Sequence, residues 1–114
     1  MSAEALEAER AAALAQIAAL TGEFDAVVAA SRSSNADDEH DPEGATIAFE
    51  RQQVAALLDQ AHRRLADVDE ALRRAAAGEY GTCAECGRPI GAERLAARPQ
   101  ARTCIECAGR TGRR

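Results

Sequence analysis

Apolar residues recur at helical spacing from Ser2 to about Ser33. They follow one another at intervals of seven, four, three, four and three, at Leu6, Ala13, Ile17, Leu20, Phe24 and Val27. Intervals of three and four keep side chains on one face of a helix, as in the heptads of a coiled coil. The pattern has a gap at Arg10, and Thr21 and Gly22 interrupt it later. Because glycine costs a helix about 1 kcal/mol relative to alanine, a bend at Gly22 stays open.

A second apolar repeat, in the middle of the chain, is more regular. Its members step by four and three without a break, at Val54, Leu58, Ala61, Leu65, Val68, Leu72 and Ala75, with Ile47 one heptad upstream. Two such repeats joined by a short connection predict an antiparallel coiled coil over residues 1–77. Each helix would hold about 30 residues and measure roughly 45–50 Å at 1.5 Å per residue. The predicted fold is therefore mainly α, a long helical hairpin.

The connection between the two repeats, residues 34–44, is polar and strongly acidic. Its acids, the candidates for a functional tip, are Asp37, Asp38, Glu39, Asp41 and Glu43. Asp41 followed by Pro42 is a start signal for the second helix, because aspartate caps free N–H groups and proline suits the first helical position. Two other interpretations of this part stay open. The acids of a polar turn can serve solubility alone, or His40 can join them in a weak cation site. His62 is interpreted as a solvated helix residue.

The second helix is predicted to end near Gly78, which suits the position just after a helix. The segment 78–107 that follows is short and rich in glycine and proline. Its few large apolar side chains are Tyr80, Ile90, Leu95 and Ile105. A segment this poor in core residues needs a covalent or metal staple to fold. Residues 108–114 are predicted to be a short tail, the frayed end of a helix.

Four cysteines provide that staple. Cys83 and Cys86 form one C-x-x-C pair, and Cys104 and Cys107 form a second pair after seventeen intervening residues. This spacing predicts one tetrahedral four-thiolate zinc site, which is structural because no ligand position stays open for water or substrate. An iron site, a redox dithiol and two disulfides are the alternatives, but a thioredoxin-like dithiol needs a βαβ pattern that the sequence lacks. Zinc binding is expected to drive folding of residues 78–107.

Composition and charge bear on whether the protein binds nucleic acid. The 114 residues carry a net charge of −5 and only three aromatic side chains, and every basic residue is arginine. Residues 1–50 contain eleven acids and two bases, whereas residues 78–114 contain seven arginines and four glutamates. The net charge opposes a general binder of phosphate backbones, although the basic end leaves a local nucleic-acid contact open.

The sequence also bears on location. No apolar run approaches the roughly 20 residues needed to span a bilayer. The N-terminal segment carries Glu4, Glu7 and Glu9 where a signal peptide carries positive charge. We therefore expect a cytoplasmic protein without membrane contact, in a reducing environment where paired cysteines are metal ligands.

Residues 78–107, predicted to be a four-cysteine zinc finger, have further sequence features beyond the cysteines. A G-x-Y-G-x-C lead-in runs from Gly78 to Cys83, and a C-G-x-x-I-G turn runs from Cys86 to Gly91. An R-L-x-A-R-P segment from Arg94 to Pro99 and the C-I-x-C pair complete the set. Together they resemble the finger of the DksA/TraR family of bacterial transcription regulators, and the resemblance covers roughly residues 35–107.

The resemblance implies a protein that binds RNA polymerase rather than DNA. In that family the coiled coil enters the secondary channel of the polymerase, and acidic tip residues approach the catalytic centre and modulate initiation. Many members act together with ppGpp, a further candidate partner that the residues here do not support. The tip differs from the family's Asp-x-x-Asp-x-Ala. Aligned on Asp41, Gly44 replaces the second aspartate and Thr46 the alanine; aligned on Asp38 and Asp41, Glu43 replaces the alanine.

Two other classes of protein remain as alternatives. One is a zinc-finger protein that reads DNA through the arginines around the finger. The other is a coiled-coil adaptor that binds other proteins through the hairpin. An enzyme is not expected, because the sequence assembles no nucleophile, general base or open metal site. We expect a monomer.

Overall fold

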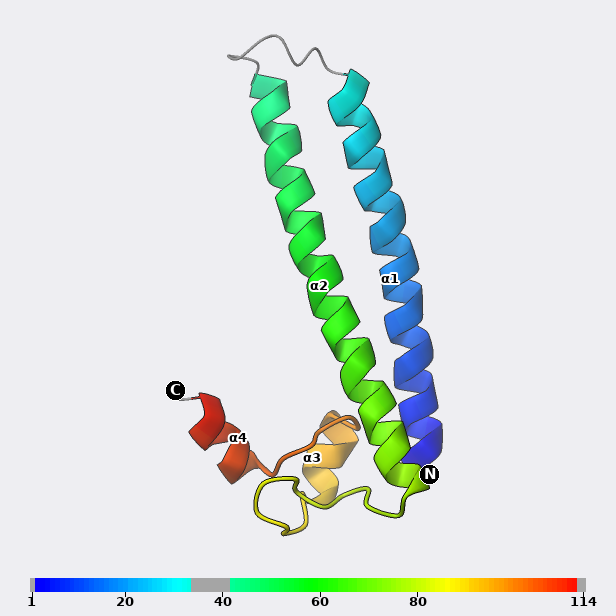
Figure 1. The fold of residues 1–114 in the computed structure, drawn as a ribbon, viewed down its shortest axis with the longest axis vertical. Helices are drawn as coiled ribbons and strands as arrows, with labels where there is room; N and C mark the ends of the chain where they lie inside the picture. The colour runs from blue at the N-terminus through cyan, green and yellow to red at the C-terminus, as the bar shows by residue number, and fades with distance from the viewer. Residues whose placement is uncertain (1, 34–41, 113–114) are drawn as a thin grey trace. The chain divides into compact units, whose positions relative to one another are not determined.

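The computed structural model describes residues 2–33 and 42–112, and these residues are mainly helical (Figure 1). Helices α1 (Ser2–Ser33) and α2 (Pro42–Ala76) are long, and α3 (Ala92–Ala97) and α4 (Ile105–Gly112) are short. Within these two described ranges no β-strand forms, and one isolated antiparallel bridge joins Thr82 to Pro89. The predicted fold class is confirmed.

The chain forms two compact units. The finger unit comprises residues 1–12 and 64–114, and the hairpin unit comprises residues 13–63. Both long helices contribute to both units, so each unit contains a stretch of α1 beside an antiparallel stretch of α2 (Figure 1).

The hairpin unit places the predicted apolar seam between its helices. Ala13, Leu20 and Ala61 are buried. The other seam residues of this unit are partly buried, namely Ile17, Phe24, Val27, Ile47, Val54 and Leu58. Helix α2 begins at Pro42, as the sequence predicts, whereas the tip residues from Asp37 to Asp41 lie outside the described residues.

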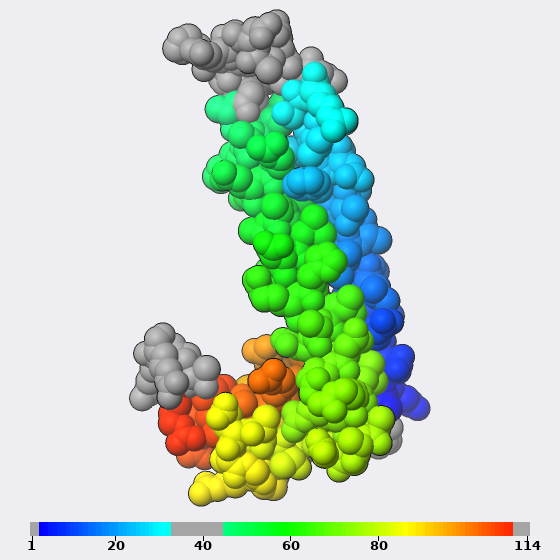
Figure 2. Space-filling view, viewed as in Figure 1, coloured from blue at the N-terminus to red at the C-terminus, as the bar shows by residue number. Residues whose placement is uncertain are grey.

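The finger unit joins the ends of the two long helices to the cysteine segment. Leu6 of α1 and Val68 of α2 are completely buried. Arg10, which occupies the gap in the heptad pattern, donates from Nε to Oδ1 of Asp69 at 2.7 Å. Arg64 and Glu9 form a second ion pair between the same helices, also at 2.7 Å. Figure 2 shows the finger residues, in yellow, packed against the yellow-green end of α2.

Helix α1 meets a length and composition criterion for a membrane-spanning helix over Ala3–Arg32. By this criterion the sequence expectation that no apolar stretch is long enough to span a bilayer is wrong for α1. Alanine supplies much of the apolar character of α1, and its side chain removes little surface from water when it is buried. One such helix near an N-terminus is a weak indication of a membrane span, and Leu6, Ala13 and Leu20 of α1 are buried within the protein.

Gly78 ends α2 in the predicted manner. Its φ is +78°, in the left-handed region that glycine adopts without strain. The N–H of Glu79 donates to the carbonyl of Arg74 at 2.8 Å, and the N–H of Gly78 donates to the carbonyl of Ala75 at 3.1 Å. This pair of hydrogen bonds defines a Schellman motif, which satisfies carbonyls that the end of a helix leaves without partners. Gly22, in contrast, lies inside α1, which continues through it without interruption.

Alanine substitutions at these two glycines should have opposite effects. An added Cβ meets no atom within 4 Å at either position, so the backbone conformation alone decides the outcome. Gly22→Ala should stabilise the protein by about 1 kcal/mol, because alanine favours a helix. Gly78→Ala should destabilise it by about 1–2 kcal/mol, because the left-handed conformation costs a residue with a Cβ. Urea unfolding of the two variants measures both changes, and shifts of the same sign would contradict the assignment.

Candidate metal centre

The first cysteine pair lies in a tight turn. The N–H of Cys83 donates to the carbonyl of Arg88 at 2.8 Å, and the N–H of Gly87 donates to the carbonyl of Cys83 at 3.0 Å. Gly87 follows the second cysteine of the pair with a φ of +75°, which lets the chain reverse directly after Cys86. Both sulfurs of the pair can therefore face one point.

The second pair lies at the start of α4. Cys104 directly precedes the helix, Cys107 lies in its first turn, and the N–H of Ala108 donates to the carbonyl of Cys104 at 2.9 Å. A further hydrogen bond, from the N–H of Ala84 to the carbonyl of Arg102 at 2.8 Å, ties the two pairs together.

The four sulfur atoms lie within 4.8 Å of one another. The sulfurs of Cys86 and Cys104 are 3.8 Å apart. A regular tetrahedron with zinc–sulfur bonds of about 2.3 Å has edges of about 3.8 Å, so this separation suits a zinc ion. Among the residues that the structure describes, these cysteines are the one such cluster of His, Cys, Asp or Glu. The finger thus fits one structural zinc ion.

The core around the cysteines is small. Cys83 and Cys107 are buried together with Ile90 and Ala101, and Leu95 and Cys104 pack against them. Ile105, one of the few large apolar side chains of this segment, does not join the core, because the residue is 69% exposed. Ile105 stands between two cysteines that both turn inward at the start of α4, and this leaves it on the outer side. So small an apolar cluster needs the metal to be stable.

The ionisation of the cysteines also favours a cation at this point. Burial raises the pKa of Cys83, but backbone N–H groups of Cys86, Cys104 and Glu85 act in the other direction and lower it to about 6. Burial raises the pKa of Cys107 to about 12, and hydrogen bonds with the thiols of Cys104 and Cys83 act in the same direction. Without a cation, ionisation of the Cys83 thiol is thus favoured and ionisation of the Cys107 thiol is disfavoured. A divalent cation bound between the sulfurs stabilises all of the thiolates together.

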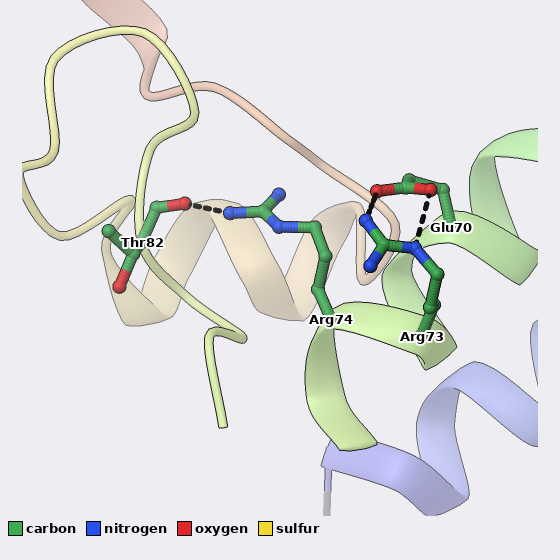
Figure 3. A network of polar contacts seen from close by, with 4 residues as sticks. All are labelled: Glu70, Arg73, Arg74 and Thr82. Carbon is green, nitrogen blue, oxygen red and sulfur yellow. Dashed lines mark hydrogen bonds and ion pairs between the residues drawn. The ribbon is translucent and has the colours of Figure 1, made fainter. Parts of the chain in front are cut away.

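Three arginines have structural roles that the sequence analysis did not identify. Arg94 donates from Nε to the carbonyl of Thr103 at 2.8 Å. Arg74, the one buried charged residue in the described ranges, donates to the carbonyl of Thr82 (Figure 3). Arg110 donates to the sulfur of Cys107 at 3.0 Å. The only advance signal was for Arg110, which lies three residues after Cys107 and so faces the same side of a helix.

The end of α2 borders a groove of about 560 Å³ beside the finger. Its lining includes Glu70, Arg73, Arg74, Thr82 and Arg102. Figure 3 shows the Glu70 carboxylate held by Arg73, whose Nε lies 3.1 Å from Oε1, while Arg74 turns away toward Thr82. The hydrogen bond from Arg73 lowers the pKa of Glu70. The two neighbouring arginines therefore serve different contacts, one within α2 and one between α2 and the finger.

Comparison with known proteins agrees with this geometry. Residues 78–111 match the prokaryotic dksA/traR C4-type zinc finger. A solved structure, the transcription factor DksA2 from Pseudomonas aeruginosa, aligns with 95% of this chain and 83% of its own, with 32% sequence identity and a TM-score of 0.57. The chain belongs to the DksA/TraR family.

Curated relatives in that family match over a shorter length. Two proteins named RNA polymerase-binding transcription factor DksA, from the NA1000/CB15N and ATCC 19089 strains of Caulobacter vibrioides, are 45% identical over 56 residues. The alignment covers 49% of this chain and 39% of each relative. The resemblance inferred from the finger motifs is thus confirmed at the level of the DksA/TraR family.

Proposed function

We propose that this chain binds RNA polymerase and regulates transcription initiation through the acidic turn between α1 and α2. One observation carries the proposal: the match to a DksA2 structure extends over 95% of the chain and so includes both long helices as well as the finger. The relatives from Caulobacter vibrioides are named for polymerase binding. An acidic tip on a helical hairpin has the charge to enter a positively charged channel.

Within the tip, Asp37, Asp38, Glu39, Asp41 and Glu43 are the proposed polymerase-contacting residues. Glu43 matches one feature of the family's tip motif, because Ala45 follows it two residues later. That spacing is the one between the last acid and the alanine of the family's Asp-x-x-Asp-x-Ala. In this alignment Glu43 replaces the second aspartate and keeps its negative charge, whereas His40 stands at the position of the first aspartate.

The finger is proposed to act as a structural element. Cys83, Cys86, Cys104 and Cys107 would bind zinc with four thiolates and leave no open coordination position, so the metal would have no catalytic task. We propose that the protein is not an enzyme and works as a cytoplasmic monomer. Burial of Ala13, Leu20 and Ala61 within the hairpin unit supports a hairpin that needs no second copy.

A DNA-reading finger is less well supported. Arg94 and Arg110 contact the finger's own carbonyl and sulfur atoms. This leaves fewer arginines for the phosphate contacts on which DNA affinity depends. A coiled-coil adaptor stays an alternative, and ppGpp stays a candidate partner without direct support.

The proposal predicts binding to core RNA polymerase and a tip-dependent effect on transcription. The full chain should co-purify with the polymerase. Replacing Asp37, Asp38 and Asp41 with alanine, or Glu43 with glutamine, should preserve binding but remove most of the effect on transcription in vitro. Asp59→Asn, at an exposed acid within α2, is the matched control and should behave as the wild type.

The outcomes separate the two parts of this proposal. Absence of polymerase binding by the wild-type protein would overturn it. Binding with an unchanged effect in all tip variants would reject the tip mechanism alone. A salt-dependent shift of duplex DNA at physiological ionic strength would instead support the DNA-binding alternative.

A further inference from the structure

Arg110 is placed to act on the metal centre from outside its coordination sphere. It lies on α4 three residues after Cys107, and its Nη2 donates to the Cys107 sulfur at 3.0 Å. The Arg110 residue itself is exposed, whereas Cys107 is 2% exposed. A surface cation therefore reaches a sulfur atom that water scarcely contacts.

The negative charge expected for a zinc-loaded centre makes a contact with a cation favourable. Four thiolates around one divalent zinc ion carry a net charge of −2, in a small site that is partly closed to solvent. At Cys83 the backbone N–H groups of Cys86, Cys104 and Glu85 serve the sulfur. At Cys107 one hydrogen-bond donor, Arg110, carries a full positive charge. Hydrogen bonds to charged groups are shorter and roughly twice as strong as neutral ones.

We propose that Arg110 is a zinc-retaining residue, which holds Cys107 as a bound thiolate by offsetting part of the negative charge of the centre. A thiolate that also accepts a hydrogen bond from a guanidinium must give up that contact as well as the metal before it leaves the site. Partners of metal ligands commonly influence affinity in this way. The inference concerns the zinc centre alone and does not depend on polymerase binding.

The test is zinc transfer from the zinc-loaded full-length protein to an excess of the chromogenic chelator 4-(2-pyridylazo)resorcinol. Arg110→Ala should lower zinc affinity by about 10-fold to 100-fold, with correspondingly faster transfer, which is the usual range for loss of a ligand's partner. Alanine favours helices more than arginine does, so the change does not weaken α4 through its helix propensity. Arg98→Ala, at an exposed arginine directly after α3, is the control and should transfer zinc at the wild-type rate.

Two further variants separate charge from hydrogen bonding. Arg110→Lys keeps the charge and should retain zinc better than Arg110→Gln, which keeps a neutral donor. With cobalt(II) in place of zinc, Arg110→Ala should also move the thiolate-to-metal charge-transfer band to longer wavelength, because the sulfur lone pairs lose a stabilising donor. Wild-type transfer rates in Arg110→Ala, or an equal acceleration in Arg98→Ala, would overturn the proposal. So would an unshifted cobalt band.

Discussion

Removal of zinc unfolds the finger and leaves the hairpin unit helical; this is the largest effect that we expect. The finger's buried cluster comprises Cys83, Ile90, Ala101 and Cys107, with Leu95 and Cys104 packed against it. Structural zinc in finger peptides contributes about 10–16 kcal/mol, which is more than this cluster can replace. Hydrogen exchange read by mass spectrometry should show loss of protection over residues 79–112 after chelation. Residues 13–33 and 45–63 should keep theirs.

Substitution of a ligand should reproduce the effect of chelation. Cys107→Ser removes a buried sulfur and should abolish stoichiometric zinc binding together with finger protection. Glu106→Gln, at the exposed neighbouring position, is the control and should leave both unchanged. Retained protection in the zinc-free protein would show that the finger folds without metal and that the cysteines have another role.

The same zinc affinity should fall as the pH is lowered. At pH 7 the Cys83 thiol, with a pKa of about 6, is already ionised, whereas Cys107, with a pKa of about 12, holds its proton until the metal displaces it. Zinc binding at pH 7 therefore releases protons. Below about pH 6 protonation of Cys83 adds to the competition, so affinity should decline more steeply there. Calorimetry in buffers of different ionisation enthalpy measures the released protons.

Leu6→Ala should destabilise the finger unit by about 2–5 kcal/mol, the range found for buried leucines. Leu6 is completely buried, and Val68 of α2 is buried to the same degree in the same unit. Truncation leaves a cavity in a close-packed seam between two helices, and the surrounding side chains relax only partly to fill it.

Leu14→Ala is the matched control, because Leu14 lies on the same helix and is 41% exposed. Its substitution should change stability by about 0.5 kcal/mol or less, as surface changes usually do. Urea unfolding followed by circular dichroism compares the two variants. Equal effects would show that the heptad seam does not define the packed face of α1.

The sequence predicted the parts of the fold that local rules govern. The heptad spacing identified Leu6, Leu20, Ala61 and Val68 as inward-facing, and all four are buried. The end of α2 followed from the backbone freedom of Gly78. Each of these features depends on residues close together in the chain. Spacing of three and four places side chains on one face of a helix, and glycine allows the left-handed backbone at a helix end. Both can therefore be recognised in a single sequence.

Contacts between distant residues were harder to foresee. The pairing of Arg10 with Asp69 depends on how two helices meet, which no local pattern records. In the finger, apolarity suggested burial of Ile105, but the inward turn of its two neighbouring cysteines decided the outcome. The sequence showed the arginines only as a basic end of the chain, because charge alone does not reveal which side chains donate to carbonyls or sulfur.

The two ion pairs of the finger unit bear on the register of the helices. A heptad repeat presents an apolar side chain at every layer, so a slip by one heptad would still place apolar residues of α1 opposite apolar residues of α2. After a slip, Arg10 would face His62 or Ala76 in place of Asp69. Arg64 would lose Glu9 as well. Exposed ion pairs add little to stability, yet here they penalise the wrong alignments and so select one pairing of α1 with α2.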